Sequence, residues 1–214
     1  MSKILPSYSL KVKNLQLIRS RRDILSNICL SVKSGEALIL RGANGIGKTS
    51  LLMALAGYLH IEAGLIGWEK TKQDDDEKTA YEDMHFISHQ YAIKENLSLT
   101  ENLKFWADMN GGSKDDVFMA LEKAGLGHGA DFEALMLSQG QKKRLSLARL
   151  LVSKKPIWLL DEPTSALDSE GDKWVASLID NHLDDGGLVI AATHLDLPMK
   201  KNKRIKTIIL GQDK

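Results

Sequence analysis

Eight consecutive residues, Gly42 to Thr49, carry the clearest chemical signal in the chain. They fit the phosphate-loop pattern, in which a glycine and four further residues precede Gly-Lys-Thr. Glycines let backbone N–H groups converge on phosphate oxygens, and the start of a following helix adds partial positive charge. We expect Lys48 to reach the β- and γ-phosphates of a nucleoside triphosphate and Thr49 to bind Mg²⁺. The predicted nucleotide-binding residues are Gly42, Ala43, Asn44, Gly45, Ile46, Gly47, Lys48, Thr49 and Ser50.

The flanks of this loop have the context that the pattern requires. Apolar residues 37–40 predict a buried strand before the loop, and residues 50–56 predict a helix that ends at Gly57. The alternative is a glycine-rich turn with a chance lysine, but that alternative leaves the flanking strand and helix unexplained.

Two adjacent carboxylates follow a second apolar run. Residues 157–160 predict a buried strand, which Asp161 and Glu162 follow. Ligand-binding groups in open α/β sheets lie at the carboxyl ends of strands. We therefore expect Asp161 to hold Mg²⁺ through water and Glu162 to polarise an attacking water. The alternative, two surface acids at a strand end, is weakened by the phosphate loop upstream.

Ser138 and Gln141 have the spacing of a capping box, which stabilises the start of a helix. The helix is predicted over residues 138–153. A capped helix N-terminus is also an anion site, so the structural and the anion-binding interpretations are compatible.

The elements that must position these residues alternate along the chain. Residues 10–32 predict an antiparallel β layer, and residues 91 to about 152 predict a helical insert. Further predicted elements are strands at 64–68, 84–88, 188–193 and 204–210 and a helix at 173–183. This order favours an α/β fold: a phosphate-loop NTPase core with a mostly parallel sheet, in a single domain over 1–214.

Composition excludes several classes of protein. The chain has 214 residues, with 43% hydrophobic and 27% charged residues and a net charge of +1, so we expect no nucleic-acid partner. The basic clusters 19–22 and 200–204 are expected to be solvated surface, with membrane-proximal or partner contact as the alternative. The sequence contains no uninterrupted run of about 18 apolar residues, so no membrane-spanning helix is expected. Cys29 is expected to pack as a small apolar residue in a strand.

Taken in order, the motifs resemble those of the ATP-binding cassette (ABC) family over essentially the whole chain. They are the phosphate loop, Gln90, Leu137-Ser138-Gln139-Gly140-Gln141, Asp161-Glu162, Ser165-Ala166-Leu167-Asp168 and His194. The resemblance implies an ABC nucleotide-binding domain that hydrolyses ATP. In such a domain, the helical subdomain of about 91–152 is inserted in a RecA-like core.

The resemblance also implies roles for residues that composition and spacing do not explain. Gln90 would contact Mg²⁺ and sense a partner through the helical insert, and His194 would touch the γ-phosphate. The signature residues would cap the γ-phosphate bound in another subunit, so that two copies form a head-to-tail dimer around ATP. These residues are Ser138, Gly140 and Gln141, and Asp168 would lie in a loop crossing the subunit interface. The implied catalytic residues are Glu162, His194, Lys48 and Gln90.

Two positions depart from the family pattern. Gln139 stands where the signature has its first glycine, which is tolerated if its φ stays negative. Residues 15–22 contain none of the aromatic residues that stack on adenine in the family. Arg19 is a candidate to stack through its guanidinium instead.

A narrower resemblance is to the haem-exporter ATP-binding subunits of cytochrome c maturation. Similar stretches are residues 87–90, 97–103, 144–150, 166–171 and 186–194. This resemblance implies a peripheral subunit on the cytoplasmic face of the inner (cell) membrane, working with a multi-spanning partner. Haem would be handled by partners, so His85 and His89 are not expected to ligate it.

The sequence leaves three alternatives to a subunit of cytochrome c maturation. The first is the ATPase subunit of an unrelated transporter, and the second is a soluble cassette protein that acts in assembly or translation. The third is a degenerate cassette that binds ATP without turnover. Intact Lys48, Asp161, Glu162 and His194 argue against the last alternative.

Overall fold

The computed structural model describes residues 5–19, 21–71, 79–199 and 204–211. The chain divides into two compact units, each described by itself. The first contains Met1–Ser88, Lys155–Glu162 and Lys173–Lys214, and the second contains His89–Lys154 and Pro163–Asp172. The second unit therefore includes residues 163–172, which the sequence analysis placed outside the helical insert.

The first unit contains an antiparallel sheet of three strands, as predicted. The strands are β1 (Tyr8–Arg19), β2 (Arg22–Lys33) and β4 (Ala63–Lys70), in the order β2-β1-β4. Val12 of the central strand is opposite Leu30 on one side and Ile66 on the other. Apolar residues alternate along β1, so one face of the sheet is buried.

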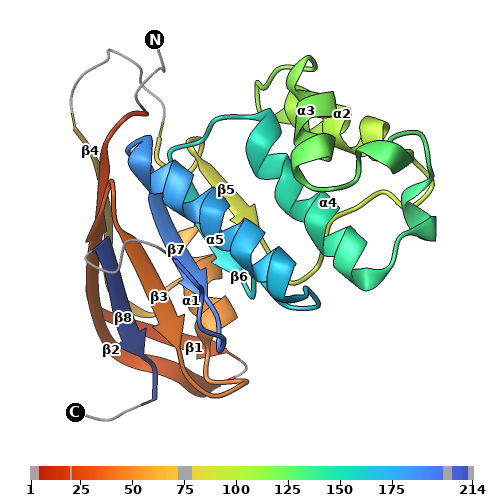
Figure 1. The fold of residues 1–214 in the computed structure, drawn as a ribbon. Coiled ribbons are helices and arrows are strands. Elements are labelled where there is room, and N and C mark those ends of the chain that lie inside the picture. The colour runs from red at the N-terminus through yellow and green to blue at the C-terminus, as the bar shows by residue number, and fades with distance from the viewer. Residues whose placement is uncertain (1–4, 20, 72–78, 200–203, 212–214) are drawn as a thin grey trace. The chain divides into compact units, whose positions relative to one another are not determined.

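A second sheet in this unit is wholly parallel, which confirms the predicted parallel core. Its order is β5 (Met84–Ile87), β6 (Ile157–Asp161), β7 (Leu188–Ala192), β3 (Ala37–Arg41) and β8 (Ile205–Ile209). Because β6, β7 and β3 are neighbours and parallel, their carboxyl ends meet at one edge (Figure 1). That edge is where such sheets bind ligands.

The main core of the first unit lies around α1 (Lys48–Leu55). Leu51, Leu52 and Leu55 are fully buried and join one hydrophobic cluster with residues of both sheets. The helix begins at Lys48, two residues before the predicted start. Its first residues thus continue directly from the glycine-rich loop, and its buried leucines anchor that loop to the sheet.

The opposite face of the parallel sheet carries α5 (Ser169–Asp184), which crosses in front of β7 in Figure 1. The buried His182 ring stacks on Trp158 of β6, with centroids 3.7 Å apart and planes inclined by 9°. Its Nε2–H donates to the carbonyl oxygen of Pro156 at 3.1 Å. Burial lowers the pKa of His182 to about 3, so the ring is neutral at physiological pH.

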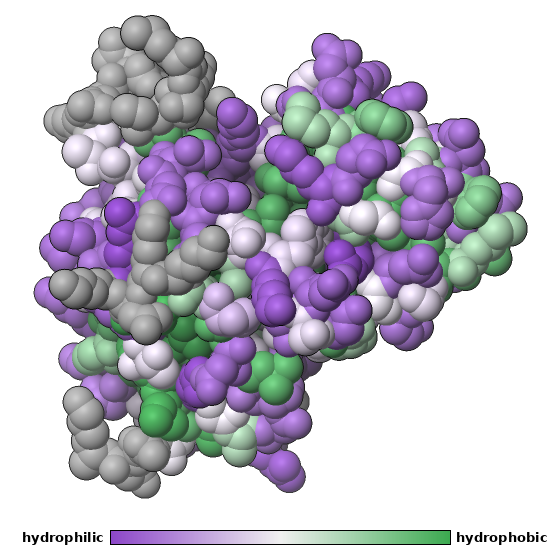
Figure 2. Space-filling model, viewed as in Figure 1, coloured by the Kyte–Doolittle hydropathy of each residue, from purple (hydrophilic) through white to green (hydrophobic). Residues whose placement is uncertain are grey.

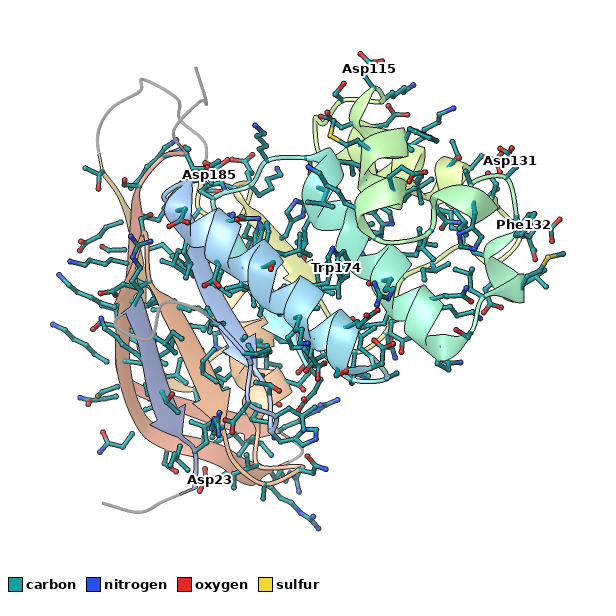
Figure 3. The ribbon with its side chains drawn as sticks, viewed as in Figure 1. Asp23, Asp115, Asp131, Phe132, Trp174 and Asp185 are labelled. Atoms are coloured by element: carbon teal, nitrogen blue, oxygen red, sulfur yellow. The ribbon has the colours of Figure 1, made fainter. Side chains whose placement is uncertain are left out.

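The second unit is built mainly from helices. They are α2 (Leu99–Met109), α3 (Asp116–Lys123) and α4 (Gln139–Val152), with short 3₁₀ turns η1 (Gly127–Gly129) and η2 (Ala134–Met136). Both α2 and α4 begin with a capping box, from Ser98 and Ser138 respectively. Exposed side chains such as Asp131 and Phe132 project from this unit (Figure 3).

Some sequence expectations need correction or fall outside the description. Cys29 lies in β2 but is exposed, so its predicted packing as an apolar residue is wrong. Its thiol donates to Oδ1 of Asn14, and the Asn14 N–H donates to its sulfur, both at 3.3 Å. Ser20 of the basic cluster 19–22 and residues 200–203 of the cluster 200–204 lie outside the described residues.

The surface of the described chain is largely polar. Figure 2 shows hydrophilic side chains over much of the viewed face, with scattered apolar groups between them. Within the described ranges, no helix combines the length and the apolar composition needed to cross a bilayer.

His182 generates a prediction about stability and pH. Its pKa is 6.5 when unfolded and about 3 when folded, so it contributes stability above pH 6.5 that is lost as the pH falls towards 3. Each pKa unit is worth about 1.4 kcal/mol. His182→Phe keeps a ring on Trp158 but cannot be protonated. We expect its melting temperature, followed by circular dichroism, to fall less than that of the wild type between pH 7 and 4. Parallel curves for the two proteins would contradict this role of His182.

Candidate functional site

The phosphate loop joins β3 to α1 in a conformation that only glycine adopts readily. Gly47 has φ 109° and stands at the N-cap of α1. A Cβ atom there would lie 2.7 Å from Cγ2 of Ile24, inside van der Waals contact. Gly45 also has a positive φ of 81°, but a Cβ there would meet no atom within 4 Å. Backbone conformation therefore requires glycine at both positions, and at Gly47 the packing requires it as well.

Lys48 is buried, and its ammonium group points back at the start of the loop. Its Nζ donates to the carbonyl oxygens of Gly42 at 2.8 Å and Ala43 at 3.2 Å. A buried ammonium costs free energy unless it is hydrogen-bonded, so these contacts stabilise the charge. They hold a positive charge beside the N–H groups of the loop, an arrangement suited to a polyphosphate.

Thr49 and Asp161 come from different elements and meet at the edge of the sheet. The Thr49 hydroxyl donates to Oδ2 of Asp161 at 2.9 Å, and Asp161 is buried at the end of β6. A hydroxyl and a carboxylate are both oxygen ligands of the kind that Mg²⁺ prefers. The two predicted metal ligands of the first unit therefore fit a magnesium ion in their chemistry.

Glu162 and His194 also lie together. Nδ1 of His194 is 3.0 Å from Oε2 of Glu162, a hydrogen bond in which the imidazole donates to the carboxylate. Glu162 has φ 46°, unusual for a residue with a side chain, and its N–H donates to the carbonyl oxygen of Ala192 at 2.8 Å. Strained backbone of this kind is concentrated at functional sites. Both residues keep a water-accessible part, as a reaction with water requires.

The signature residues lie in the second unit, at the start of α4. The Ser138 hydroxyl accepts from the N–H of Gln141 at 3.3 Å, and the Gln141 side chain accepts from the N–H of Ser138 at 2.9 Å. This confirms the capping box. Gln139 is the first residue of α4 and is absent from the described residues with positive φ, so it fits this position without strain. A Cβ at Gly140 would lie 2.9 Å from the carbonyl oxygen of Ala166.

Asp168 has a structural role that the sequence analysis missed. Its Oδ1 accepts from the N–H of Gly171 at 2.7 Å and lies 3.5 Å from Nη2 of Arg144. The first contact caps α5, which explains why this helix begins four residues before its predicted start. An aspartate followed by Glu170 and Asp172 in the first turn is the signal that indicates this start.

The predicted site residues thus fall into two sets. The first unit contains the phosphate loop, Asp161, Glu162 and His194, and the second contains Gln90, Ser138, Gly140, Gln141 and Asp168. Gln90 is exposed and lies in the bend after β5.

Sequence reasoning missed two contacts beside the loop. Arg41, the last residue of β3, forms an ion pair with Asp196, two residues beyond His194. Ile24 of β2 contacts the loop at Gly47. Once β3 and β7 are known to be parallel neighbours, the opposite charges of Arg41, at the end of β3, and Asp196, after β7, indicate the ion pair. Nothing local in the sequence indicates Ile24.

Comparison with known proteins supports the same class. Residues 25–165 match the family described as ABC transporter. The cytochrome c biogenesis ATP-binding export protein CcmA of Rhodopseudomonas palustris (strain HaA2) is 45% identical over 185 residues, covering 86% of this chain and 91% of the relative. The protein of the same name from Vibrio cholerae is 39% identical over 207 residues, covering 96% and 100%.

Solved structures have the same fold. A putative ABC transporter ATP-binding protein from Pyrococcus furiosus has a TM-score of 0.78 at 24% identity, covering 94% of this chain and 97% of that one. An ATP-binding cassette in a dimeric post-hydrolysis state, bound to ADP and Pi, has a TM-score of 0.76 at 26% identity, covering 95% and 97%.

Fold and sequence together define an ATP-binding cassette ATPase. The chain belongs to the ABC transporter family and, within it, to the group of the cytochrome c biogenesis ATP-binding export proteins.

The geometry of the loop predicts different effects for two alanine substitutions. Gly47→Ala combines an unfavourable φ with a contact of 2.7 Å to Ile24, whereas Gly45→Ala suffers only the unfavourable φ, worth about 1–2 kcal/mol. We expect Gly47→Ala to lose nucleotide binding, measured with a fluorescent ATP analogue, and to melt at a lower temperature than Gly45→Ala. Equal losses in both variants would show that the packing of Gly47 against Ile24 is unimportant.

Proposed function

We propose that this chain is the ATP-hydrolysing subunit of a membrane ABC complex in cytochrome c maturation, where it drives haem export or release of the haem-loaded chaperone. One observation carries the proposal. Lys48, the Thr49–Asp161 pair and the Glu162–His194 pair all lie at or beyond the carboxyl ends of three adjacent parallel strands. Haem itself is handled by partners.

The first unit supplies the groups that ATP hydrolysis needs. Lys48 moves from its carbonyl contacts to the β- and γ-phosphates and offsets their negative charge. Glu162 takes a proton from the attacking water as the water oxygen bonds to the γ-phosphorus. The bond from the γ-phosphorus to the β–γ bridging oxygen then breaks, leaving ADP and phosphate. His194 fixes the Glu162 carboxylate and contacts the γ-phosphate.

Thr49 and Asp161 are the residues of the first unit that would hold Mg²⁺, and Gln90 is the proposed ligand from the second. When bound, the ion would neutralise charge that develops on the phosphate oxygens. The 2.9 Å contact between Thr49 and Asp161 supports this role because it already brings two oxygen ligands together.

The site is completed by a second copy of the chain. Ser138, Gly140 and Gln141 form a capped helix start, which favours an anion, but they belong to a different compact unit from the phosphate loop. In the proposed head-to-tail dimer, the signature of each copy caps the γ-phosphate in the other, and Asp168 lies in the loop at the interface. The dimeric state of a 26% identical cassette supports this arrangement.

The proposed complex places this chain on the cytoplasmic face of the inner membrane, against a multi-spanning subunit. The support is the printed name of its relatives, which describes ATP-binding export proteins of cytochrome c biogenesis. Assembly and disassembly of the ATP-bound dimer would supply the movement, because ATP binds the closed state selectively. Nucleic acid has no part in this function.

Glu162→Gln tests the proposed function directly. The amide keeps the shape of the carboxylate but cannot accept the water proton, so ATP binds without being hydrolysed. We expect turnover to fall at least 100-fold and the dimer to accumulate with ATP and Mg²⁺, seen as a doubled mass in light scattering. Lys48→Ala in the same background is the control and should remain monomeric with ATP.

The same variant identifies the complex. Affinity purification of Glu162→Gln from gently solubilised membranes should recover a multi-spanning protein together with haem-handling subunits, identified by mass spectrometry and haem absorbance. Recovery of a different permease would be consistent with the ATPase mechanism but would assign the chain to another transport pathway. Recovery of only soluble proteins would overturn the membrane role.

Ser138→Arg tests whether the signature serves the opposite subunit. A bulky cation at the cap should block dimer closure, so hydrolysis should fall at least tenfold while ATP still binds to the same chain. Ser138→Ala is the matched control, since it removes the cap, worth about 1 kcal/mol, without adding bulk. Loss of ATP binding in Ser138→Arg would contradict the assignment of the signature.

A further inference from the structure

The hairpin that joins β1 to β2 packs against the phosphate loop. Ile24 and Leu25, near the start of β2, enclose Gly47. A Cβ atom at Gly47 would lie 2.7 Å from Cγ2 of Ile24 and 3.1 Å from Cγ of Leu25. Asp23, beside them, lies at the end of the first unit towards which the arrows of β3 and β7 point (Figure 3). The hairpin is therefore a wall of the loop, formed by the antiparallel sheet of the same unit.

Two arginines face each other at the end of this hairpin. Arg19, the last residue of β1, is paired with Arg22, the first residue of β2. Side chains alternate along a strand, so Arg19 lies on the same face of the sheet as Leu17, which is fully buried. That face covers the core around α1. The arginine pair is thus on the inner face of the sheet, at the point where the core ends and the strands reach solvent.

This pair lowers the stability of the hairpin. Like charges directly opposite each other on two strands are destabilising. Neither side chain forms an ion pair or a hydrogen bond with any other residue that the structure describes, and both are exposed. The carboxylate of Asp23 is opposite Ile18 instead, and it accepts from Nε2 of Gln16 at 3.1 Å. Two guanidinium groups kept together beside a phosphate loop, without a described acid, therefore indicate a ligand.

The surroundings of the loop identify the part of the nucleotide that reaches the pair. In the proposed function Glu162 and His194 act at the γ-phosphate, and they follow β6 and β7, on one side of β3. The nucleoside must then extend away from β6 and β7. Beyond the end of β8 the space is filled by Ile46, since a Cβ atom at Gly211 would lie 2.7 Å from its Cδ1. The hairpin is the remaining wall along which the nucleoside can extend.

A guanidinium group is suited to the face of a purine base. It is planar and positively charged, and it stacks on π-systems whose faces are electron-rich. Residues 15–25 contain no aromatic side chain that could take this role. Reading the edge of a base requires a donor fork held in the plane of that base. No described residue fixes the guanidinium groups of Arg19 and Arg22 in this way, so the pair is suited to stacking rather than to edge readout.

We propose that Arg19 and Arg22 form the base-binding subsite of this chain, in which a guanidinium group of the pair stacks on the purine without reading its edge. This inference rests on the proposed function, in which the phosphate loop binds ATP. The bound base offsets the repulsion within the hairpin, because its electron-rich face lies against the cations. Adenine and guanine both offer such a face, so ATP and GTP bind with similar affinity.

The test compares ATP, GTP and inorganic tripolyphosphate, which has the phosphates but no base. Their Kd values are measured by calorimetry on the full chain without Mg²⁺, so that no hydrolysis occurs. Replacing both arginines, Arg19→Ala with Arg22→Ala, should raise the Kd for ATP and for GTP about tenfold and leave that for tripolyphosphate within about twofold. Arg19→Tyr in the Arg22→Ala background should restore both nucleotide affinities to within about threefold of wild type, because a ring can stack without charge.

Arg21 supplies the matched control. It lies at the tip of the same hairpin with φ 61°, a conformation that asparagine tolerates. Arg21→Asn therefore removes a neighbouring positive charge without straining the turn, and all three Kd values should stay within about twofold of wild type.

The three ligands separate this inference from the proposed function. Equal weakening of all three in the double alanine variant would show that the arginines act only through charge, and unchanged nucleotide binding would show that they do not contact the base. A strong preference for one purine that disappears in this variant would indicate edge readout. Each of these results would overturn the stacking subsite. Failure of tripolyphosphate to bind the wild type, or undiminished binding to Lys48→Ala, would instead contradict the phosphate loop and the proposed function with it.

Discussion

The parallel pairing of β3, β7 and β6 is the constraint on which the site depends. Leu40 of β3 is opposite Ala192 of β7, and Ala192 is opposite Asp161 of β6. This register brings the ends of the three strands level, so the loops that follow them open at one edge. A slip of one residue would turn every side chain of a strand to the other face. The hydrogen bond between Thr49 and Asp161 exists only because this register holds.

The same strand pairing explains why the backbone is strained at Glu162. The N–H of Glu162 donates to the carbonyl oxygen of Ala192, so the sheet pairing extends one residue beyond β6. Its φ of 46° then turns the chain sharply and directs the carboxylate towards His194. A regular extended residue would avoid the strain but would point the side chain along the strand. Strain at Glu162 is thus the consequence of a carboxylate that must leave a rigid sheet at its edge.

Much of this architecture could be predicted from the sequence, because the relevant signals are local. The apolar runs before Gly42 and Asp161, the glycines of the loop and the Ser138–Gln141 spacing each indicate an element within a few residues. Contacts between distant segments could not be found this way. Ile24 against Gly47 depends on how β2 passes the loop, and the exposure of Cys29 depends on its position in the irregular pairing of β1 with β2. Sequence likewise cannot show that Lys143 is buried, since three consecutive basic residues normally indicate a solvated helix face.

The distribution of the site over two units has a physical consequence. The residues predicted to bind phosphate lie in the first unit, and the signature and Gln90 lie in the second. α4 is the element that connects most of the second set: it begins with the signature, pairs with Asp168 through Arg144, and contacts Tyr91, the residue after Gln90, through Lys143 and Arg149. Because a helix is stiff over its 14 residues, it holds these groups in fixed positions relative to one another. The proposed coupling of ATP to a membrane partner requires such a unit, because its parts must respond together.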